Sequence, residues 1–273
     1  MPPPLAIQEH LPAGETLAER LAAARAAGFD GLELLDADRS RAPELEPLRR
    51  DGARFPTACP ALGGWLGDFD SARRQRAVDG LRRQLDGVAA LGGHGVVSPA
   101  AWGMFTRRLP PFDEPPRTPE EDREVLLEGL AEVGAHAAAA GVVLLFEPLN
   151  RYEDHMVNTL AQGAELTAAA GSPGVRLLAD TYHMNIEEDE LCGALRASAG
   201  VLGAVHLSDS NRGQPGTGHV PFDAIVATLA EVGFDGVLSV ECRLRGESVE
   251  AAASAGRYLR GLLDAWPVSN ISR

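Results

Sequence analysis

Four short apolar runs in the second half of the chain each end at a side chain that can bind a metal ion. The runs cover residues 142–147, 175–180, 202–206 and 237–241, and a polar segment follows each. A short apolar run that stops at a polar loop is typical of a buried strand in a parallel sheet. Segments of helical length separate the runs, at 159–170, 187–198 and 221–232. The pattern therefore predicts repeated strand–helix units.

The first half of the chain carries the same alternation. We expect strands at 5–8, 32–35, 54–59 and 95–98, and helices at 16–27, 71–91 and 118–140, with a last helix at 248–264. Eight strands in such an alternation favour an α/β fold, a single-domain (β/α)8 TIM barrel over residues 1–273. A doubly wound open sheet is the alternative, although no glycine-rich dinucleotide motif follows any strand. A long connection at about 99–117 is expected after the fourth strand, as a lid or pocket wall.

Composition excludes several classes of function. The net charge of −14 argues against binding of nucleic acid, which attracts clustered positive charge. The chain contains no lysine, which excludes a Schiff-base lysine, a pyridoxal phosphate anchor and a phosphate-loop lysine. No run approaches the roughly 18 apolar residues of a membrane span, and no signal peptide opens the chain. Three scattered cysteines form no disulfide framework, so we expect a cytoplasmic protein.

The residues that end the four runs are Glu147, Asp180, His206 and Glu241. In a barrel, the carboxyl ends of the strands meet at one rim, where active sites lie. Three carboxylates and one imidazole form a hard, oxygen-rich set that suits Mn²⁺, Mg²⁺ or Co²⁺. Any one of them alone would be an ordinary surface or cap residue, but four in matching positions predict a site for one divalent cation.

Longer motifs surround these residues. Glu147 begins Glu-Pro-Leu-Asn-Arg-Tyr-Glu, Asp180 begins Asp-Thr-Tyr-His-Met-Asn-Ile-Glu-Glu, His206 begins His-Leu-Ser-Asp-Ser-Asn-Arg, and residues 216–222 read Gly-Thr-Gly-His-Val-Pro-Phe. Together they resemble the D-tagatose/D-psicose 3-epimerase group of the xylose isomerase-like barrels, over roughly residues 120–245. Residues before 115 resemble that group only in their general barrel pattern.

The resemblance implies roles for several residues. Glu147, Asp180, His206 and Glu241 would bind one divalent cation, typically manganese, and Glu147 and Glu241 would also act as the acid/base pair on opposite faces of a sugar. Three further residues match positions that contact the O1–O3 end of the substrate: Glu153, His183 and Arg212. His219 would support the ligands from behind or shape a turn. Glu33 and His155 are weaker candidates for a role in the site. Barrels of this kind form dimers or tetramers, so we expect a homo-oligomer.

The chemistry expected from these residues is proton transfer next to a carbonyl, with a carboxylate on each face of the sugar. The chain departs from the ketose epimerases after Glu241, where Cys242 and Arg243 replace a proline and an aromatic residue. The sugar, free or phosphorylated, is therefore left open. The predicted activity is thus a metal-dependent 3-epimerase or aldose–ketose isomerase. The alternatives are an inosose-type dehydratase, a non-catalytic sugar-binding barrel and, against the charge and the histidine count, an endonuclease IV-type nuclease.

Overall fold

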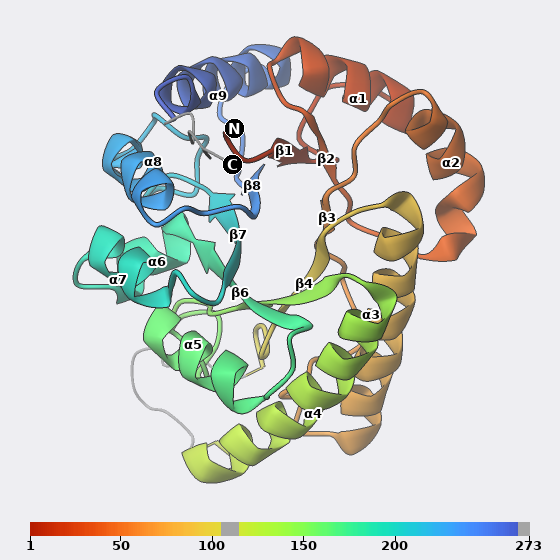
Figure 1. The fold of residues 1–273 in the computed structure, drawn as a ribbon, viewed down its shortest axis with the longest axis vertical. Coiled ribbons are helices and arrows are strands. Elements are labelled where there is room, and N and C mark those ends of the chain that lie inside the picture. The colour runs from red at the N-terminus through yellow and green to blue at the C-terminus, as the bar shows by residue number, and fades with distance from the viewer. Residues whose placement is uncertain (105–114, 267–273) are drawn as a thin grey trace, which may run out of the picture.

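The computed structural model describes residues 1–104 and 115–266 of the chain. Parallel strands form a ring with helices around its outside, which is the predicted TIM barrel in a single domain (Figure 1). Hydrogen bonds link the strands in the order β2-β1-β8-β7-β6-β5-β4-β3. Their bounds are β1 (Leu5–Gln8), β2 (Gly31–Glu33), β3 (Thr57–Ala58), β4 (Gly95–Pro99), β5 (Val143–Glu147), β6 (Val175–Asp180), β7 (Leu202–Leu207) and β8 (Val237–Val240).

The two ends of this strand order meet, so the sheet closes on itself. The backbone N–H of Leu34 donates to the carbonyl of Thr57 at 2.9 Å, and the N–H of Cys59 donates to the carbonyl of Leu34 at 2.8 Å. Leu34 and Ala58 thereby form a parallel bridge between β2 and β3. A closed ring of parallel strands excludes the doubly wound open sheet.

The helices connect successive strands and cover the outer face of the ring (Figure 1). Thr16, Thr118 and Thr159 each cap a helix with reciprocal side-chain and backbone hydrogen bonds, which fixes the starts of three helices. The helices are α1 (Leu17–Ala26), α2 (Ala42–Arg50), α3 (Ser71–Leu91), α4 (Pro119–Ala140), α5 (Leu160–Ala169), α6 (Thr181–Glu187), α7 (Leu191–Ser198), α8 (Phe222–Glu231) and α9 (Ser248–Leu263). Within the described ranges, no helix is both long and apolar enough to cross a membrane.

Helices α2 and α6 were not expected, α7 begins at Leu191 instead of residue 187, and strands β2 and β3 are shorter than expected. Helix α2 was not predicted, because Pro47 lies in its interior, where proline disfavours a helix. Helix α6 was read as a polar loop, because it starts directly at the strand end that Asp180 marks. The third strand is limited to Thr57–Ala58, inside the expected 54–59. The expected long connection lies between β4 and α4, and residues 105–114 of it lie outside the described residues.

Alternation along the strands separates an inner from an outer core. Val97, Leu145, Leu178, Ala204 and Val237 pack together as one buried cluster. They come from β4 to β8, so this cluster fills the inside of the barrel, whereas the larger cluster lies between the strands and the helices. Side chains two residues apart on a strand point to the same face. Glu147, Asp180 and His206 follow Leu145, Leu178 and Ala204 by two residues, so they also point inward.

Candidate metal centre

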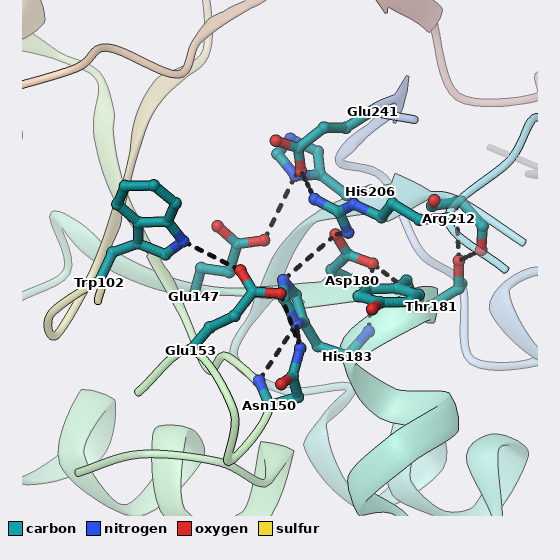
Figure 2. A network of polar contacts seen from close by, with 12 residues as sticks. Trp102, Glu147, Asn150, Glu153, Asp180, Thr181, His183, His206, Arg212 and Glu241 are labelled. Carbon is teal, nitrogen blue, oxygen red and sulfur yellow. Dashed lines mark hydrogen bonds and ion pairs between the residues drawn. The ribbon is translucent and has the colours of Figure 1, made fainter. Parts of the chain in front are cut away.

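The structure brings Glu147, Asp180, His206 and Glu241 together at the carboxyl end of the barrel. Glu147 ends β5, Asp180 ends β6, His206 lies in β7 and Glu241 directly follows β8. One ligand atom from each lies within 4.8 Å of the others (Figure 2). Neighbouring strands of a parallel barrel end at one rim, which explains why four residues far apart in sequence converge.

His206 lies between the other ligands and the inside of the barrel, fully buried. Its Nδ1 is 2.9 Å from Oε2 of Glu241 and 3.4 Å from Oε1 of Glu147. Its Nε2 is 3.1 Å from the carboxylate of Glu33. Burial alone would lower the pKa of His206, but the carboxylates of Glu33 and Glu241 outweigh it and raise the pKa well above its ordinary value.

The two glutamates of the centre differ in their electrostatic surroundings. Burial raises the pKa of Glu147, and His206 only partly opposes this. Burial also acts to raise the pKa of Glu241, but His206 and Arg212 lower it well below its ordinary value. The two carboxyl groups therefore differ in proton affinity, as an acid/base pair requires.

The donor set fits a divalent cation. Among the described residues, Oε1 of Glu147 and Nδ1 of His206 are buried and make no well-aligned hydrogen bond, although both lie close to acidic or basic neighbours. Buried polar atoms are normally satisfied, so two that face one another across a cluster of carboxylates indicate a place for a ligand. Three carboxylates and an imidazole suit Mn²⁺ or a similar hard cation, whose charge would balance theirs.

Asp180 has a structural role as well as a place in the centre. Its Oδ1 accepts hydrogen bonds from the backbone N–H groups of Tyr182 at 2.7 Å and His183 at 3.4 Å. It thus caps α6, and this cap fixes the direction of the carboxylate. Its other oxygen, Oδ2, is free to face the centre, where the guanidinium of Arg212 lies 2.6 Å away.

Arg212 reaches the centre from the loop after β7. Its second guanidinium nitrogen lies 3.1 Å from Oε2 of Glu241, and the group stacks 4.8 Å from the ring centroid of Tyr182. Among the described residues, Arg212 is the one non-glycine residue with positive φ, at 57°. A side chain in this left-handed region costs roughly 1–3 kcal/mol, which the surrounding structure must supply. The two ion pairs and the stacking hold the backbone in this state.

Glu153 and His183 lie at the edge of the centre, joined through Asn150 (Figure 2). The side-chain amide of Asn150 donates to Glu153 at 3.0 Å and lies 2.7 Å from Nδ1 of His183. The indole N–H of Trp102 donates to the other oxygen of Glu153 at 3.0 Å. His183 Nε2 is 3.8 Å from Asp180. All of these side chains gather beside the ligands, where a substrate would meet them.

Arg151, two residues before Glu153, pairs with Glu187, with guanidinium–carboxylate distances of 2.7–3.1 Å. Glu153 therefore keeps its carboxylate for Asn150 and Trp102.

His219 lies on the exposed part of the loop between β7 and α8. Its Nδ1 is 3.0 Å from the hydroxyl of Ser210, and its backbone N–H donates to the same oxygen at 3.2 Å. Asp209 holds this loop by accepting backbone hydrogen bonds from several of its residues, among them Gly216 at 2.9 Å. These contacts favour the turn-shaping role of His219, and support of the ligands remains a prediction.

Sequence reasoning underrated Glu33 and missed Asn150 as parts of this network. Glu33 is fully buried at the end of β2, beneath His206. The signal was present, because a glutamate inside the apolar segment Gly-Leu-Glu-Leu-Leu is rare unless it has a buried partner. The partner itself, on the far side of the barrel, could not be read from the sequence.

Comparison with known proteins agrees with this geometry. The model of the xylose isomerase-like TIM barrel family matches residues 21–262. The 3-dehydro-D-guloside 4-epimerase of Escherichia coli is 39% identical over 236 residues, which cover 85% of this chain and 89% of that protein. The L-ribulose 3-epimerase of Mesorhizobium japonicum is 34% identical over 82% of this chain and 75% of its own length.

Solved structures give the same result. The crystal structure of 3-keto-D-glucoside 4-epimerase from Escherichia coli superposes with a TM-score of 0.90 at 36% identity, over 95% of this chain and 99% of that one. A structure of L-ribulose 3-epimerase superposes with a TM-score of 0.81 at 28% identity, over 96% and 95%. The chain therefore belongs to the xylose isomerase-like TIM barrel family and is an enzyme of its epimerase and isomerase class.

Proposed function

We propose that this chain is a divalent-metal-dependent sugar epimerase, which inverts a carbon atom next to a carbonyl group by moving a proton. The observation that carries the proposal is the pair of carboxylates, Glu147 and Glu241, set around one cation-binding cluster with Asp180 and His206. The cation, held by these four residues, would stabilise the negative charge that develops on the sugar as the proton leaves. Sugar epimerases that match most of the chain support the same reaction class.

The protein side chains would move the proton. One of Glu147 and Glu241 removes it from one face of the sugar, and the other delivers a proton to the opposite face, which inverts the carbon. Arg212, His183 and Glu153 lie beside the ligands with groups that can donate to or accept from sugar hydroxyls. Arg212 has a planar guanidinium whose fixed N–H directions suit adjacent oxygens.

A 3-keto glycoside is the substrate class we favour, with inversion at the neighbouring C4. The 3-dehydro-D-guloside 4-epimerase is 39% identical over 85% of the chain, compared with 34% over 82% for the L-ribulose 3-epimerase of Mesorhizobium japonicum, and a D-psicose 3-epimerase of Ruminiclostridium cellulolyticum matches 44% of the chain. The departure after Glu241, where Cys242 and Arg243 stand, also separates this chain from ketose epimerases. A free ketose inverted at C3 is the second candidate, and the chemistry at the centre is the same for both.

Three finer points belong to the proposal. Mn²⁺ is the cation we favour, since the set contains hard oxygen ligands and one imidazole. We also propose that the enzyme works in the cytoplasm as a homo-oligomer, a dimer or tetramer. Metal analysis of the purified protein, cell fractionation and light scattering test these three points separately.

The test of the reaction is turnover in deuterated water, followed by NMR with Mn²⁺ present. Epimerisation by proton transfer places deuterium at the inverted carbon, C4 of a 3-keto glycoside or C3 of a ketose. An isomerase would label C1 or C2 instead, and a dehydratase would release an unsaturated product. Glu147→Gln and Glu241→Gln should each abolish labelling, while Glu231→Gln, which removes an exposed carboxylate on α8, should not. Absence of label in every ketose and keto glycoside would refute the proposal.

A further inference from the structure

A layer of buried polar side chains lies beneath the candidate metal centre, inside the barrel. It consists of Gln8 from β1, Glu33 from β2 and Thr57 from β3, and it meets the ring of His206 from β7. None of the four side chains is more than 3% exposed. Interior positions nearer the amino ends of the strands are apolar, as in Leu145, Leu178 and Val237. Burying polar groups at this depth costs free energy unless each group has a hydrogen-bond partner.

Every contact of Glu33 in this layer is with a group that can donate a hydrogen bond. The amide nitrogen of Gln8 donates to Oε1 at 3.1 Å, and the hydroxyl of Thr57 donates to Oε2 at 2.6 Å. The remaining neighbour is Nε2 of His206, 3.1 Å from the carboxylate. Both oxygens of Glu33 already act as acceptors, so Nε2 of His206 is the donor that this contact requires.

The opposite side of the imidazole faces the ligands. With Nε2 engaged by Glu33, Nδ1 is directed at Glu241, 2.9 Å away, and at Glu147, 3.4 Å away. The ring orientation is thus set from below, by a residue that itself has no place among the four ligands. Histidines that bind metals commonly use a carboxylate in this way, and loss of such a partner weakens metal binding about 10- to 100-fold.

We propose that Glu33 is a positioning residue of the metal centre, which holds His206 with Nε2–H directed at its carboxylate and Nδ1 presented to the cation. Gln8 and Thr57 in turn hold the carboxylate of Glu33. The inference rests on the cation-dependent function proposed above, but its test needs no sugar. A purely structural role is a weaker account, because apolar side chains of similar size would fill this layer without the cost of burying a charge.

The experiment compares Glu33→Gln with Glu9→Gln. Glu9 directly follows β1 at the same end of the barrel and is also buried, but its oxygens bind Arg41 at 2.9 and 3.0 Å. Each variant removes one buried carboxylate, and only the first removes a contact to a cation ligand. Mn²⁺ affinity is measured by titration calorimetry, and folding by urea denaturation without metal. We expect Glu33→Gln to weaken Mn²⁺ binding about 10- to 100-fold and Glu9→Gln less than about 3-fold.

A second variant keeps the proposal testable if Glu33→Gln does not fold. Thr57→Val preserves the side-chain volume and removes one donor to Glu33, so Mn²⁺ binding should weaken by a smaller factor, about 3- to 10-fold. Long-range ¹H–¹⁵N spectra of the metal-free wild type should show a proton on Nε2 of His206. Equal Mn²⁺ affinity in wild type and Thr57→Val, or in wild type and folded Glu33→Gln, would overturn the proposal. So would a His206 ring that lacks the proton on Nε2.

Discussion

Replacing Arg212 by methionine separates two roles that this side chain could have in the centre. Its guanidinium is 2.6 Å from Asp180 and 3.1 Å from Glu241. Burial alone would lower the pKa of Arg212, but these two carboxylates outweigh it and raise the pKa. Without metal, Arg212→Met removes the guanidinium from the buried carboxylate of Asp180 and from the partly exposed carboxylate of Glu241. Loss of one partner of a buried ion pair costs about 3–5 kcal/mol. The Arg212 side chain is 21% exposed, so we expect the variant to lose free energy of unfolding at the low end of this range, about 3 kcal/mol.

Mn²⁺ should reduce that cost, because its charge replaces that of the guanidinium. If the destabilisation falls to about 1 kcal/mol in saturating Mn²⁺, the thermodynamic cycle requires the variant to bind Mn²⁺ about 2 kcal/mol more tightly, which is roughly 30-fold. Turnover should nevertheless be lost, since Arg212 is proposed to hold the sugar. A variant that is inactive yet binds its metal more tightly would be a distinctive result.

The assay is urea denaturation of wild type and variant, each with and without Mn²⁺, together with calorimetric titration of the metal. Arg243→Met is the matched control, because Arg243 is exposed in the adjacent segment. It should change the free energy of unfolding by less than about 0.5 kcal/mol. Equal destabilisation of Arg212→Met with and without Mn²⁺, or weaker Mn²⁺ binding, would refute the reasoning.

Three further predictions concern single residues. Glu147→Gln should lower Mn²⁺ affinity at least about 10-fold and abolish deuterium exchange into the sugar, as calorimetry and NMR would reveal; intact metal binding and exchange would contradict its role. Burial raises the pKa of Asp154 to about 6, so the stability that Asp154 contributes is fully present below its unfolded pKa near 4 and is lost as pH rises through 6. Relative to Asp154→Asn, wild type should lose about 2 kcal/mol of unfolding free energy between pH 4 and pH 7. Gly256→Ala should destabilise by about 1–3 kcal/mol because its Cβ would lie 1.8 Å from the carbonyl of Ala27, whereas Gly261→Ala, with nothing within 4 Å on the same helix, should stabilise by about 0.5–1 kcal/mol in urea denaturation.

The strands that carry the candidate ligands could be located from the sequence because local and global signals coincide there. Each apolar run in the second half is long enough to identify a buried strand, and its end is marked by the ligand itself. Residues such as Glu147 and Asp180 therefore indicate both where the strand ends and which side chain can bind the metal. The barrel then follows from the alternation, since parallel strands with helical crossovers leave few closed arrangements.

The parts that could not be predicted depend on contacts between distant segments. The sequence predicts strand β3 but not its bounds, because its two residues are too few for any periodicity to appear. Helix α2 forms in spite of Pro47, which its local sequence disfavours, so packing on the barrel outweighs propensity. The role of Glu33 depends on a neighbour 173 residues away, across the interior of the barrel. Nothing in the sequence around Glu33 identifies that partner.

The division of the centre between the two halves of the chain sets the order in which it can be built. Glu33 and Thr57 leave the ribosome early, whereas Asp180, His206 and Glu241 follow much later. Strand β8, which precedes Glu241, pairs with β1 as well as with β7. The complete centre therefore exists only after the last strand has docked on the first. A cation bound at this centre would therefore stabilise the docking of β8 on β1, and we expect its affinity to fall when that docking is lost.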